Sequence, residues 1–177
     1  MVDSIALGAD GQANHTLSLL RASDAQGPLS ADTKLVPGLW LNADPALGLG
    51  GSFSSPAGRL LEIRATTTNP GNWIGLHATL PLDDLSGVGV IGFAARIAAP
   101  DTHIVRACLR SGTENGFEDC FFDKHLLFRP EEASHLDAIA VGRRLDLPDR
   151  APWRELILFL PTQSFDLSLI DLRVFVV

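Results

Sequence analysis

Apolar and polar residues alternate along most of the chain, and this alternation favours β-strands over helices. From about residue 15 onward, apolar positions recur every second residue more often than at helical spacing. Sixteen glycines and eleven prolines interrupt these runs. No window longer than about ten residues keeps the unbroken apolar stripe of an amphipathic helix. The pattern predicts nine strands, at residues 15–23, 60–68, 72–80, 88–98, 103–111, 117–128, 135–141, 154–160 and 168–177.

Nine short strands in 177 residues are typical of an all-β domain. We expect a single domain over residues 1–177, folded as a two-sheet antiparallel β-sandwich of the jelly-roll kind. The main strands lie in residues 58–177. Residues 1–57 form an irregular N-terminal part, in which the segment 24–56 has no clean period and is expected to wrap the edge of the sandwich, with room for one further strand.

Alternation also assigns the two faces of each strand. In the strand at 72–80, one side is apolar and is expected in the core, with Ile74, Leu76, Ala78 and Leu80. The opposite side is expected to face outward, with Trp73, Gly75, His77 and Thr79. In the strand at 103–111, Arg106 and Arg110 share the side away from the core. An outer sheet face with Trp, His and Arg side chains is a candidate binding surface.

A hairpin is expected around Asn115 and Gly116, because Asn-Gly is the pair that best tolerates a two-residue type I′ turn. This turn would place Arg110 opposite Phe121 and Cys108 opposite Asp123, with Cys120 on the other face. We therefore expect two free thiols. A shifted register that set Cys108 across from Cys120 would instead permit a disulfide, which a thiol titration distinguishes.

The strand after this turn alternates rings with acids, and two interpretations of it stay open. Phe117, Asp119, Phe121 and Asp123 share one side. Rings and charged groups beside the two arginines suit a sugar, which stacks its apolar face and hydrogen-bonds through its hydroxyls. The alternative is an edge strand whose acids simply pair with Arg106 and Arg110.

Charge and motif content exclude several functions. The formal net charge of −7 disfavours nucleic acid and anionic membranes as partners. No apolar run approaches the roughly 20 residues that span a bilayer, and the N-terminus lacks the pattern of a secretory signal, so a cytoplasmic protein is expected. Neither a nucleophile elbow nor a zinc motif is present. An enzyme is therefore the less favoured alternative, although acids are available at Glu118, Asp119, Asp123 and Glu155.

The second half of the chain resembles the galactose-binding-like jelly roll of carbohydrate-binding modules. Three stretches carry the resemblance: WIGLHATLPLDDL at 73–85 leading to GFAAR at 92–96, IVRACLR at 104–110, and WREL at 153–156 followed by the closing strand IDLRVFVV at 170–177. The resemblance covers roughly residues 58–177 and is a pattern of hydrophobic positions. It implies a concave sheet face with aromatic platforms for sugar, and a structural calcium ion near the termini.

These implications select particular residues. Because the chain has no tyrosine, Trp40, Trp73 and Trp153 are its only large platforms. The resemblance places Trp153 in the core, which leaves Trp73 as the preferred platform. It also places Asp171 at the head of the last strand as a possible calcium ligand; no other cofactor is expected.

The expected function is a non-catalytic module that binds a carbohydrate or a similar polar ligand on an exposed sheet face. The arginines favour an anionic sugar. The residues assigned to this face are Trp73, His77, Arg106, Arg110, Asp119 and Asp123. The main alternative is a protein–protein assembly module that uses the same face as a homodimer interface. A glycan-active enzyme with acids on the concave sheet is the second alternative.

Overall fold

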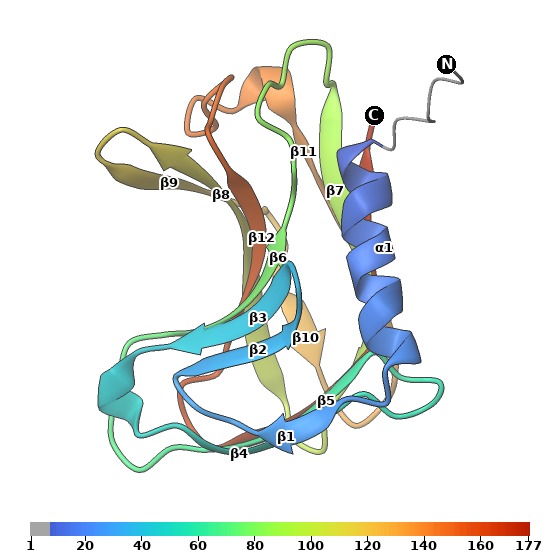
Figure 1. Cartoon of the computed structure of the whole chain (residues 1–177), viewed down its shortest axis with the longest axis vertical. Coiled ribbons are helices and arrows are strands. Elements are labelled where there is room, and N and C mark those ends of the chain that lie inside the picture. Colours follow the sequence, from blue (N-terminus) through green and yellow to red (C-terminus); the bar gives the residue numbers. More distant parts are fainter. Residues whose placement is uncertain (1–7) are drawn as a thin grey trace.

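The computed structural model describes residues 8–177, and two antiparallel sheets form a sandwich (Figure 1). One sheet has six strands in the order β1-β4-β5-β13-β7-β11, and the other has the order β10-β8-β12-β6-β3-β2 with β9 paired to β8. The strands are β1 (Gln26–Pro28), β2 (Asp32–Val36), β3 (Leu39–Ala43), β4 (Gly50–Ser54), β5 (Leu61–Thr66), β6 (Ile74–Thr79), β7 (Val90–Ala98), β8 (His103–Thr113), β9 (Gly116–Phe121), β10 (Leu126–Phe128), β11 (Ala133–Ala140), β12 (Arg154–Leu160) and β13 (Phe165–Val176). The helical segments are α1 (Ala9–Ala22), η1 (Pro45–Leu47) and η2 (Val141–Arg143). The expected all-β sandwich is confirmed.

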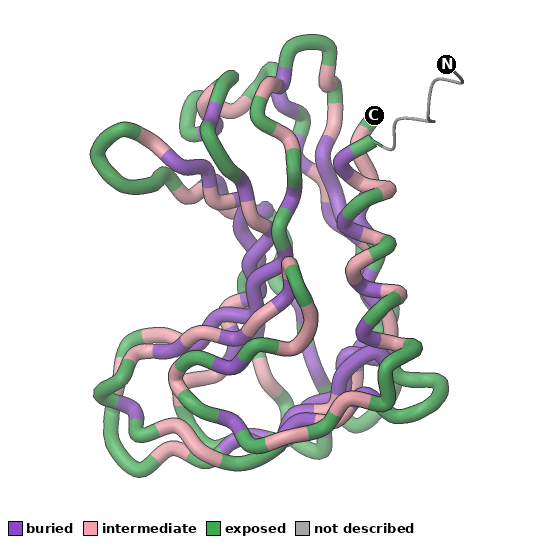
Figure 2. Tube along the Cα trace, viewed as in Figure 1, coloured by how far each residue is buried: buried purple, intermediate pink, exposed green. Residues whose placement is uncertain are grey.

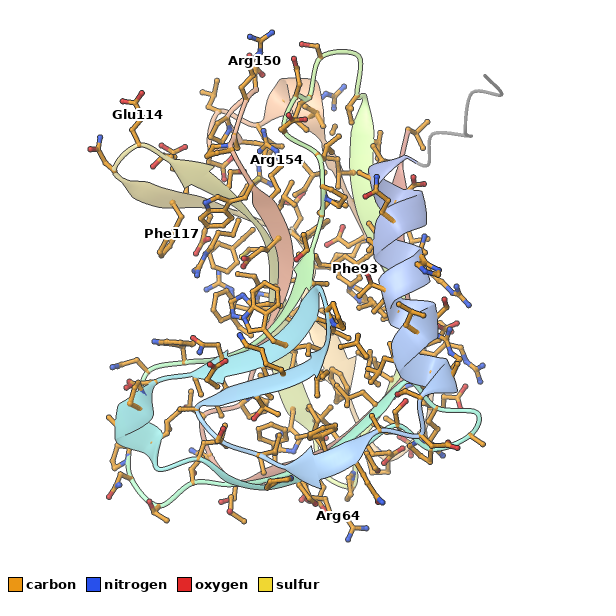
Figure 3. The ribbon with its side chains drawn as sticks, viewed as in Figure 1. Arg64, Phe93, Glu114, Phe117, Arg150 and Arg154 are labelled. Atoms are coloured by element: carbon orange, nitrogen blue, oxygen red, sulfur yellow. The ribbon has the colours of Figure 1, made fainter. Side chains whose placement is uncertain are left out.

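The core lies between the two sheets, where alternate side chains of both meet. Ile74, Leu76, Ala78 and Leu80 are buried, as expected from the alternation. Phe93 of β7 is fully buried, and Figure 3 shows its place between the layers. Figure 2 shows the buried residues concentrated where the sheets and α1 meet, with exposed residues in the loops and at the tip of the β8–β9 hairpin.

The strand expected at 15–23 is wrong, because this part of the chain belongs to helix α1. Its buried residues Ala9, Ala13, Leu17 and Leu20 recur at spacings of four, four and three, which is one face of a helix. Asp10 lies in the first turn and Arg21 in the last, both favourable for the helix dipole. No helix within residues 8–177 is both long and apolar enough to span a bilayer.

Helix α1 covers the open edge of β13. Only residues Phe165 to Leu169 of β13 pair with β5, so the second half of the strand has β7 on one side alone. The Asn14 side chain accepts a hydrogen bond from the backbone N–H of Val174 (2.9 Å) and donates one to its carbonyl (2.7 Å). An asparagine amide thus replaces a neighbouring strand at this position.

The segment 24–56, expected to be irregular with room for one strand, contains four strands. β2 and β3 extend the seven-stranded sheet, since Leu39 pairs with Ala78 and Trp40 with His77. β1 and β4 extend the other sheet next to β5. These strands are three to five residues long, too short for a clear alternation to emerge.

Candidate functional site

The seven-stranded sheet curves so that the β9 hairpin and the β2–β3 hairpin stand at the two ends of its solvent-facing side (Figure 1). We call this side the concave face. Figure 3 shows the Phe117 side chain extending from β9 on this side, whereas Arg64 points outward at the bottom of the view, away from this face. The concave face carries the candidate site.

A row of side chains crosses the concave face at right angles to the strands. Strand register places its members opposite one another on six consecutive strands, and they are Phe121, Cys108, Ile157, His77, Trp40 and Lys34. At about 4.8 Å between strands, this central row is roughly 24 Å long. Cys108 and Ile157 in its middle are fully buried, while the rings of Phe121 and Trp40 remain partly exposed.

More polar rows flank the central row on both sides. One is Asp119, Arg110, Glu155 and Thr79, and the other is Arg106, Phe159, Gly75, Asn42 and Asp32. An aromatic strip between hydrogen-bonding groups is the surface that a ring-shaped, hydroxylated ligand requires.

Trp40 and His77 form the centre of one half of this face. Their rings are stacked, with centroids 5.1 Å apart and planes 15° apart. His77 is buried, and its Nδ1 lies 2.8 Å from Oε2 of Glu155, which fixes the ring orientation. The Lys34 ammonium lies 5.7 Å from the centre of the Trp40 ring on the edge strand. The Trp40 ring therefore lies between the His77 ring and the Lys34 ammonium in the central row, and these neighbours restrict its orientation.

Gly75 makes room for this stack. A Cβ at position 75 would lie 2.6 Å from Nε2 of His77 and 3.2 Å from Cγ2 of Ile157. Nε2 of His77 is buried and has no hydrogen-bond partner among the described residues. The ring thus lies against the backbone of its own strand, which only glycine permits at this distance.

The other half of the face is built from arginines and phenylalanines. Arg110 donates two hydrogen bonds to Asp119, at 2.6 and 2.7 Å, and its guanidinium lies 3.7 Å from the centre of the Phe117 ring. The guanidinium of Arg106 lies 3.9 Å from the Phe121 ring. Burial lowers the pKa of Arg110, but the hydrogen bonds and charge of Asp119 outweigh it and raise this pKa overall. Phe121 also contacts Phe159, with centroids 5.9 Å apart.

Trp73 and Trp153 each directly precede a strand of the seven-stranded sheet. Trp73 directly precedes β6, on the same side as His77 by alternation, and its carbonyl accepts a hydrogen bond from the Asp44 N–H (2.9 Å). The expected burial of Trp153 in the core is wrong. Trp153 is 41% exposed and lies over Gly112, where a Cβ would come within 2.4 Å of its Nε1.

The register of the β8–β9 hairpin differs from the expected one by two residues. Arg110 lies opposite Asp119, not Phe121, and Cys108 lies opposite Phe121, not Asp123. The turn residues are 114 and 115, and Gly116 begins β9 with a φ of +135°. Asn115 does not take a positive φ, so the type I′ turn does not form. Because the shift is by two residues, the faces stay as expected, and the acid of β9 pairs with an arginine as the edge-strand interpretation proposed.

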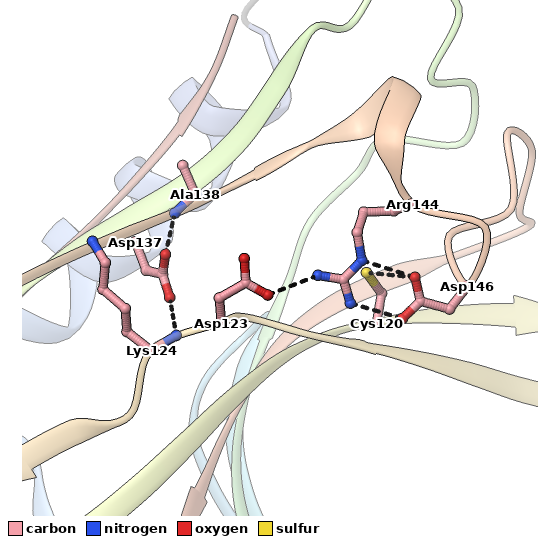
Figure 4. A network of polar contacts seen from close by, with 7 residues as sticks. All are labelled: Cys120, Asp123, Lys124, Asp137, Ala138, Arg144 and Asp146. Carbon is pink, nitrogen blue, oxygen red and sulfur yellow. Dashed lines mark hydrogen bonds and ion pairs between the residues drawn. The ribbon is translucent and has the colours of Figure 1, made fainter.

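Asp123 does not join the other candidate residues. It lies beyond β9, its side chain is 84% exposed, and it pairs with Arg144 at 3.3 Å (Figure 4). Arg144 also holds Asp146 at 2.8 Å, and the Cys120 thiol donates to the same carboxylate at 3.6 Å. The Arg144 hydrogen bonds lower the pKa of Asp146 to about 2.

Asp137 supports the chain beside this network. Its carboxylate is buried and accepts hydrogen bonds from the backbone N–H of Lys124 (2.7 Å) and of Ala138 (2.8 Å), as Figure 4 shows. The segment after β9 is thereby tied to β11. These contacts stabilise the end of the β8–β9 hairpin on the side away from the concave face.

Both cysteines are free, which agrees with the expected pair of thiols. Burial raises the pKa of Cys120 to about 12 and also raises that of Cys108. Cys120 lies opposite Leu109, on the core side of the hairpin. Neither thiol is therefore poised to react.

The surroundings of Asp171 do not fit a calcium ion. Its carboxylate accepts a hydrogen bond from Arg21 of α1 and lies 3.5 Å from Nε of Arg173. Two guanidinium groups thus occupy the position where a cation would bind, whereas calcium requires several oxygen ligands. Within residues 8–177, no three His, Cys, Asp or Glu side chains are grouped to hold a metal ion.

Of the six residues predicted for the ligand face, four lie in the rows of the concave face, Trp73 directly precedes β6, and Asp123 lies elsewhere; the four are His77, Arg106, Arg110 and Asp119. Trp40, one of the three expected platforms, was not assigned to this face because its strand lies in the segment that has no clean period. Phe159 and the contact of Glu155 with His77 were not predicted. Phe159 and Glu155 alternate with the apolar residues of β12, so alternation alone would have placed both on the outer face.

Comparison with known proteins gives fold relatives only. No protein-family model matches the sequence, and no curated protein matches it. Among solved structures, a CBM4 domain superposes with a TM-score of 0.59 at 10% identity, covering 85% of this chain and 95% of that one. The N-terminal cellulose-binding domain of β-1,4-glucanase C from Cellulomonas fimi gives 0.55 at 12% identity, over 84% and 96% of the two chains. The CBM22-1 xylan-binding domain of Xyn10C from Paenibacillus barcinonensis gives 0.53 at 8% identity, over 86% and 93%. The chain therefore has the jelly-roll fold of carbohydrate-binding modules.

Proposed function

We propose that this protein is a non-catalytic carbohydrate-binding module whose ligand lies along the central row of the concave face. The solved structures with this fold include a cellulose-binding and a xylan-binding domain, which supports a polysaccharide as the ligand class. The fold alone does not decide function, so the proposal depends on the face itself.

The observation that carries the proposal is the stacked, half-buried ring of Trp40 within a row of aromatic and apolar side chains. Trp40 and Phe121 lie four strands apart, about 19 Å at the usual spacing. A sugar ring can stack on each of them, while Asn42, Arg110 and Glu155 offer hydrogen-bonding groups on either side. The length of the row favours a chain of several sugars over a monosaccharide.

The carboxylates of this face argue for binding instead of hydrolysis. Glycoside hydrolysis needs one carboxyl group as acid and another as base or nucleophile. Here Asp119 is held by two hydrogen bonds from Arg110, and Glu155 by His77. Both acids orient their neighbours on the face.

The test is binding of soluble xylan, mixed-linkage β-glucan and hydroxyethylcellulose, measured by affinity electrophoresis and isothermal titration calorimetry. We expect at least one of them to bind and Trp40→Ala to weaken it by roughly tenfold or more, as expected for loss of a stacked ring. Phe175→Ala is the control, since it removes a half-buried ring from the other sheet. Unchanged binding by folded Trp40→Ala, or no binding of any glycan by the wild type, would reject the proposal.

A further inference from the structure

We propose that the bound polysaccharide carries carboxylate groups, as uronic acids do, and that Arg106 binds one of them. This inference rests on the proposed function and adds the ligand's charge. Arg106 is exposed and faces the concave side from the middle of β8.

The cations of the concave face differ in whether a carboxylate offsets their charge. Each other cation there has an acidic partner: Arg110 binds Asp119, and Lys34 lies 3.2 Å from Asp32. In the part of the chain that the structure describes, the Arg106 side chain makes neither a hydrogen bond nor an ion pair, and the contact found for its guanidinium is the Phe121 ring. It is the concave-face cation whose charge no carboxylate of residues 8–177 offsets.

The geometry of Arg106 suits a planar anion. Its guanidinium lies 3.9 Å from the ring centre of Phe121, so one face of the group is covered by the ring. Stacking restricts the orientation of the planar group and leaves its N–H donors unused. A guanidinium presented in this way binds a carboxylate through two parallel hydrogen bonds, which a lysine ammonium cannot reproduce.

The position of Arg106 places this contact beside the sugar chain. Arg106 lies two residues from Cys108 in β8, so its Cα is about 7 Å from the central row. A sugar bound along the central row beside Phe121 would therefore bring a substituent within reach of Arg106. The formal net charge of −7 would repel a polymer with an acid on every sugar. Spaced uronic acids on an otherwise neutral chain fit best.

The experiment compares each polymer with its own neutral form. Glucuronoxylan and xanthan provide a xylan and a β-1,4-glucan backbone with uronic acids, and chemical reduction of their carboxyl groups removes only the charge. Calorimetry at low salt is expected to show wild-type protein binding a native polymer about five- to tenfold more tightly than its reduced form, the range of one charge-assisted contact. Arg106→Gln should abolish this preference, and Arg106→Lys should restore part of it.

Arg64→Gln is the matched control. Arg64 is also exposed and without an ion pair among the described residues, but it lies on the outer face of the other sheet (Figure 3). It should leave the preference unchanged. Equal binding of native and reduced polymers, or a preference that survives Arg106→Gln, would reject the inference while leaving carbohydrate binding intact. Tighter binding of a sulfated glycan such as carrageenan without preference for uronic acids would also reject it. Failure to bind any of these polymers and the neutral glycans would reject the proposed function itself.

Discussion

The two sheets of this sandwich have outer faces of different chemistry, although both follow the same alternation of side chains. The concave face of the seven-stranded sheet holds stacked rings supported by ion pairs. Part of the outer face of the six-stranded sheet is an open hollow of about 1000 Å³, with Phe53 as its only aromatic lining residue, and Phe53 is buried. Its polar lining includes Ser52, Ser54, Glu62, Arg64, Asp166 and Ser168.

A large hollow is not by itself a suitable surface for a sugar, which also needs exposed rings to stack on. The hollow offers hydrogen-bonding groups, and three of them already bond to one another, since Arg59 donates to Ser168 at 2.6 Å and Ser168 donates to Glu62. The concave face instead exposes flat apolar area that water solvates poorly. The concave face is therefore the more suitable of the two for the proposed ligand.

The largest expected effect is a loss of stability when the buried Arg154 side chain, which supports the seven-stranded sheet, is removed. Arg154 at the start of β12 is 1% exposed, and its guanidinium donates to the carbonyls of Leu82 and Pro148 and to the Ser111 hydroxyl. Arg154→Ala leaves these buried acceptors without partners and should lower the free energy of unfolding by about 3 kcal/mol. Urea denaturation measures it.

The control for this prediction is Arg150→Ala. Arg150 pairs with Asp84 in solvent, with 81% of its side chain exposed, and its loss should change stability by less than about 0.5 kcal/mol. Equal effects of the two variants would show that the buried guanidinium does not support the sheet. Strand pairing alone would then determine the curvature of the concave face.

A smaller effect is expected when the Trp40–His77 stack is disturbed. Gly75→Ala places a methyl group 2.6 Å from Nε2 of His77, so the ring must move. We expect a loss of about 1–3 kcal/mol in unfolding free energy, together with weaker glycan binding. Gly142→Ala is the matched control, because a Cβ there meets nothing within 4 Å. Undiminished glycan binding by Gly75→Ala would mean that the stack is not part of the ligand surface.

The network behind the hairpin gives a pH-dependent test that involves neither outer face. The folded pKa of Asp146 is about 2, below its usual value near 3.8, so its charged form stabilises the fold above about pH 4, and this contribution is lost as the pH falls toward 2. Asp146→Asn removes the contribution. The difference in unfolding free energy between wild type and variant should be below about 1 kcal/mol at pH 7, because the pair is partly exposed, and should shrink toward pH 2. A difference that grows on acidification would contradict this assignment.

The smallest expected effect concerns the reactivity of two thiols that lie on opposite faces of the β8–β9 hairpin. Cys108 lies in the central row of the concave face and Cys120 on the core side, yet both are fully buried. Neither should react with a disulfide reagent in the native protein at pH 8, and two should react in denaturant. Rapid native reaction of one thiol, traced by mass spectrometry to Cys108, would indicate that the concave face is more open than the packing described.

The sequence was sufficient for features that depend on alternation within one strand. The core side of β6, the outward arginines of β8 and the placement of the two cysteines on opposite faces follow from a period of two residues. Helix α1 was missed because two residues of its buried stripe, Ala9 and Ala13, are alanines, which mark a hydrophobic face only weakly.

Features that depend on pairing between distant segments could not be predicted in the same way. Trp40 and His77 are neighbours only because β3 pairs with β6, and β3 is too short to be recognised before that pairing is known. The hairpin register depended on which residue takes a positive φ. Gly116 does so alone, and the sequence Asn-Gly is compatible with either turn.

The contact between Asn14 and Val174 has a consequence for how the edge of β13 is protected. An uncovered strand edge offers backbone donors and acceptors to any other extended chain, and pairing between two copies of the molecule is the usual result. The α1 helix prevents this along the second half of β13, where one amide side chain satisfies the backbone groups of Val174. Removal of residues 1–22 would therefore expose the backbone N–H and C=O groups along this edge of β13. Dimers or larger aggregates that pair through β13 are the expected product.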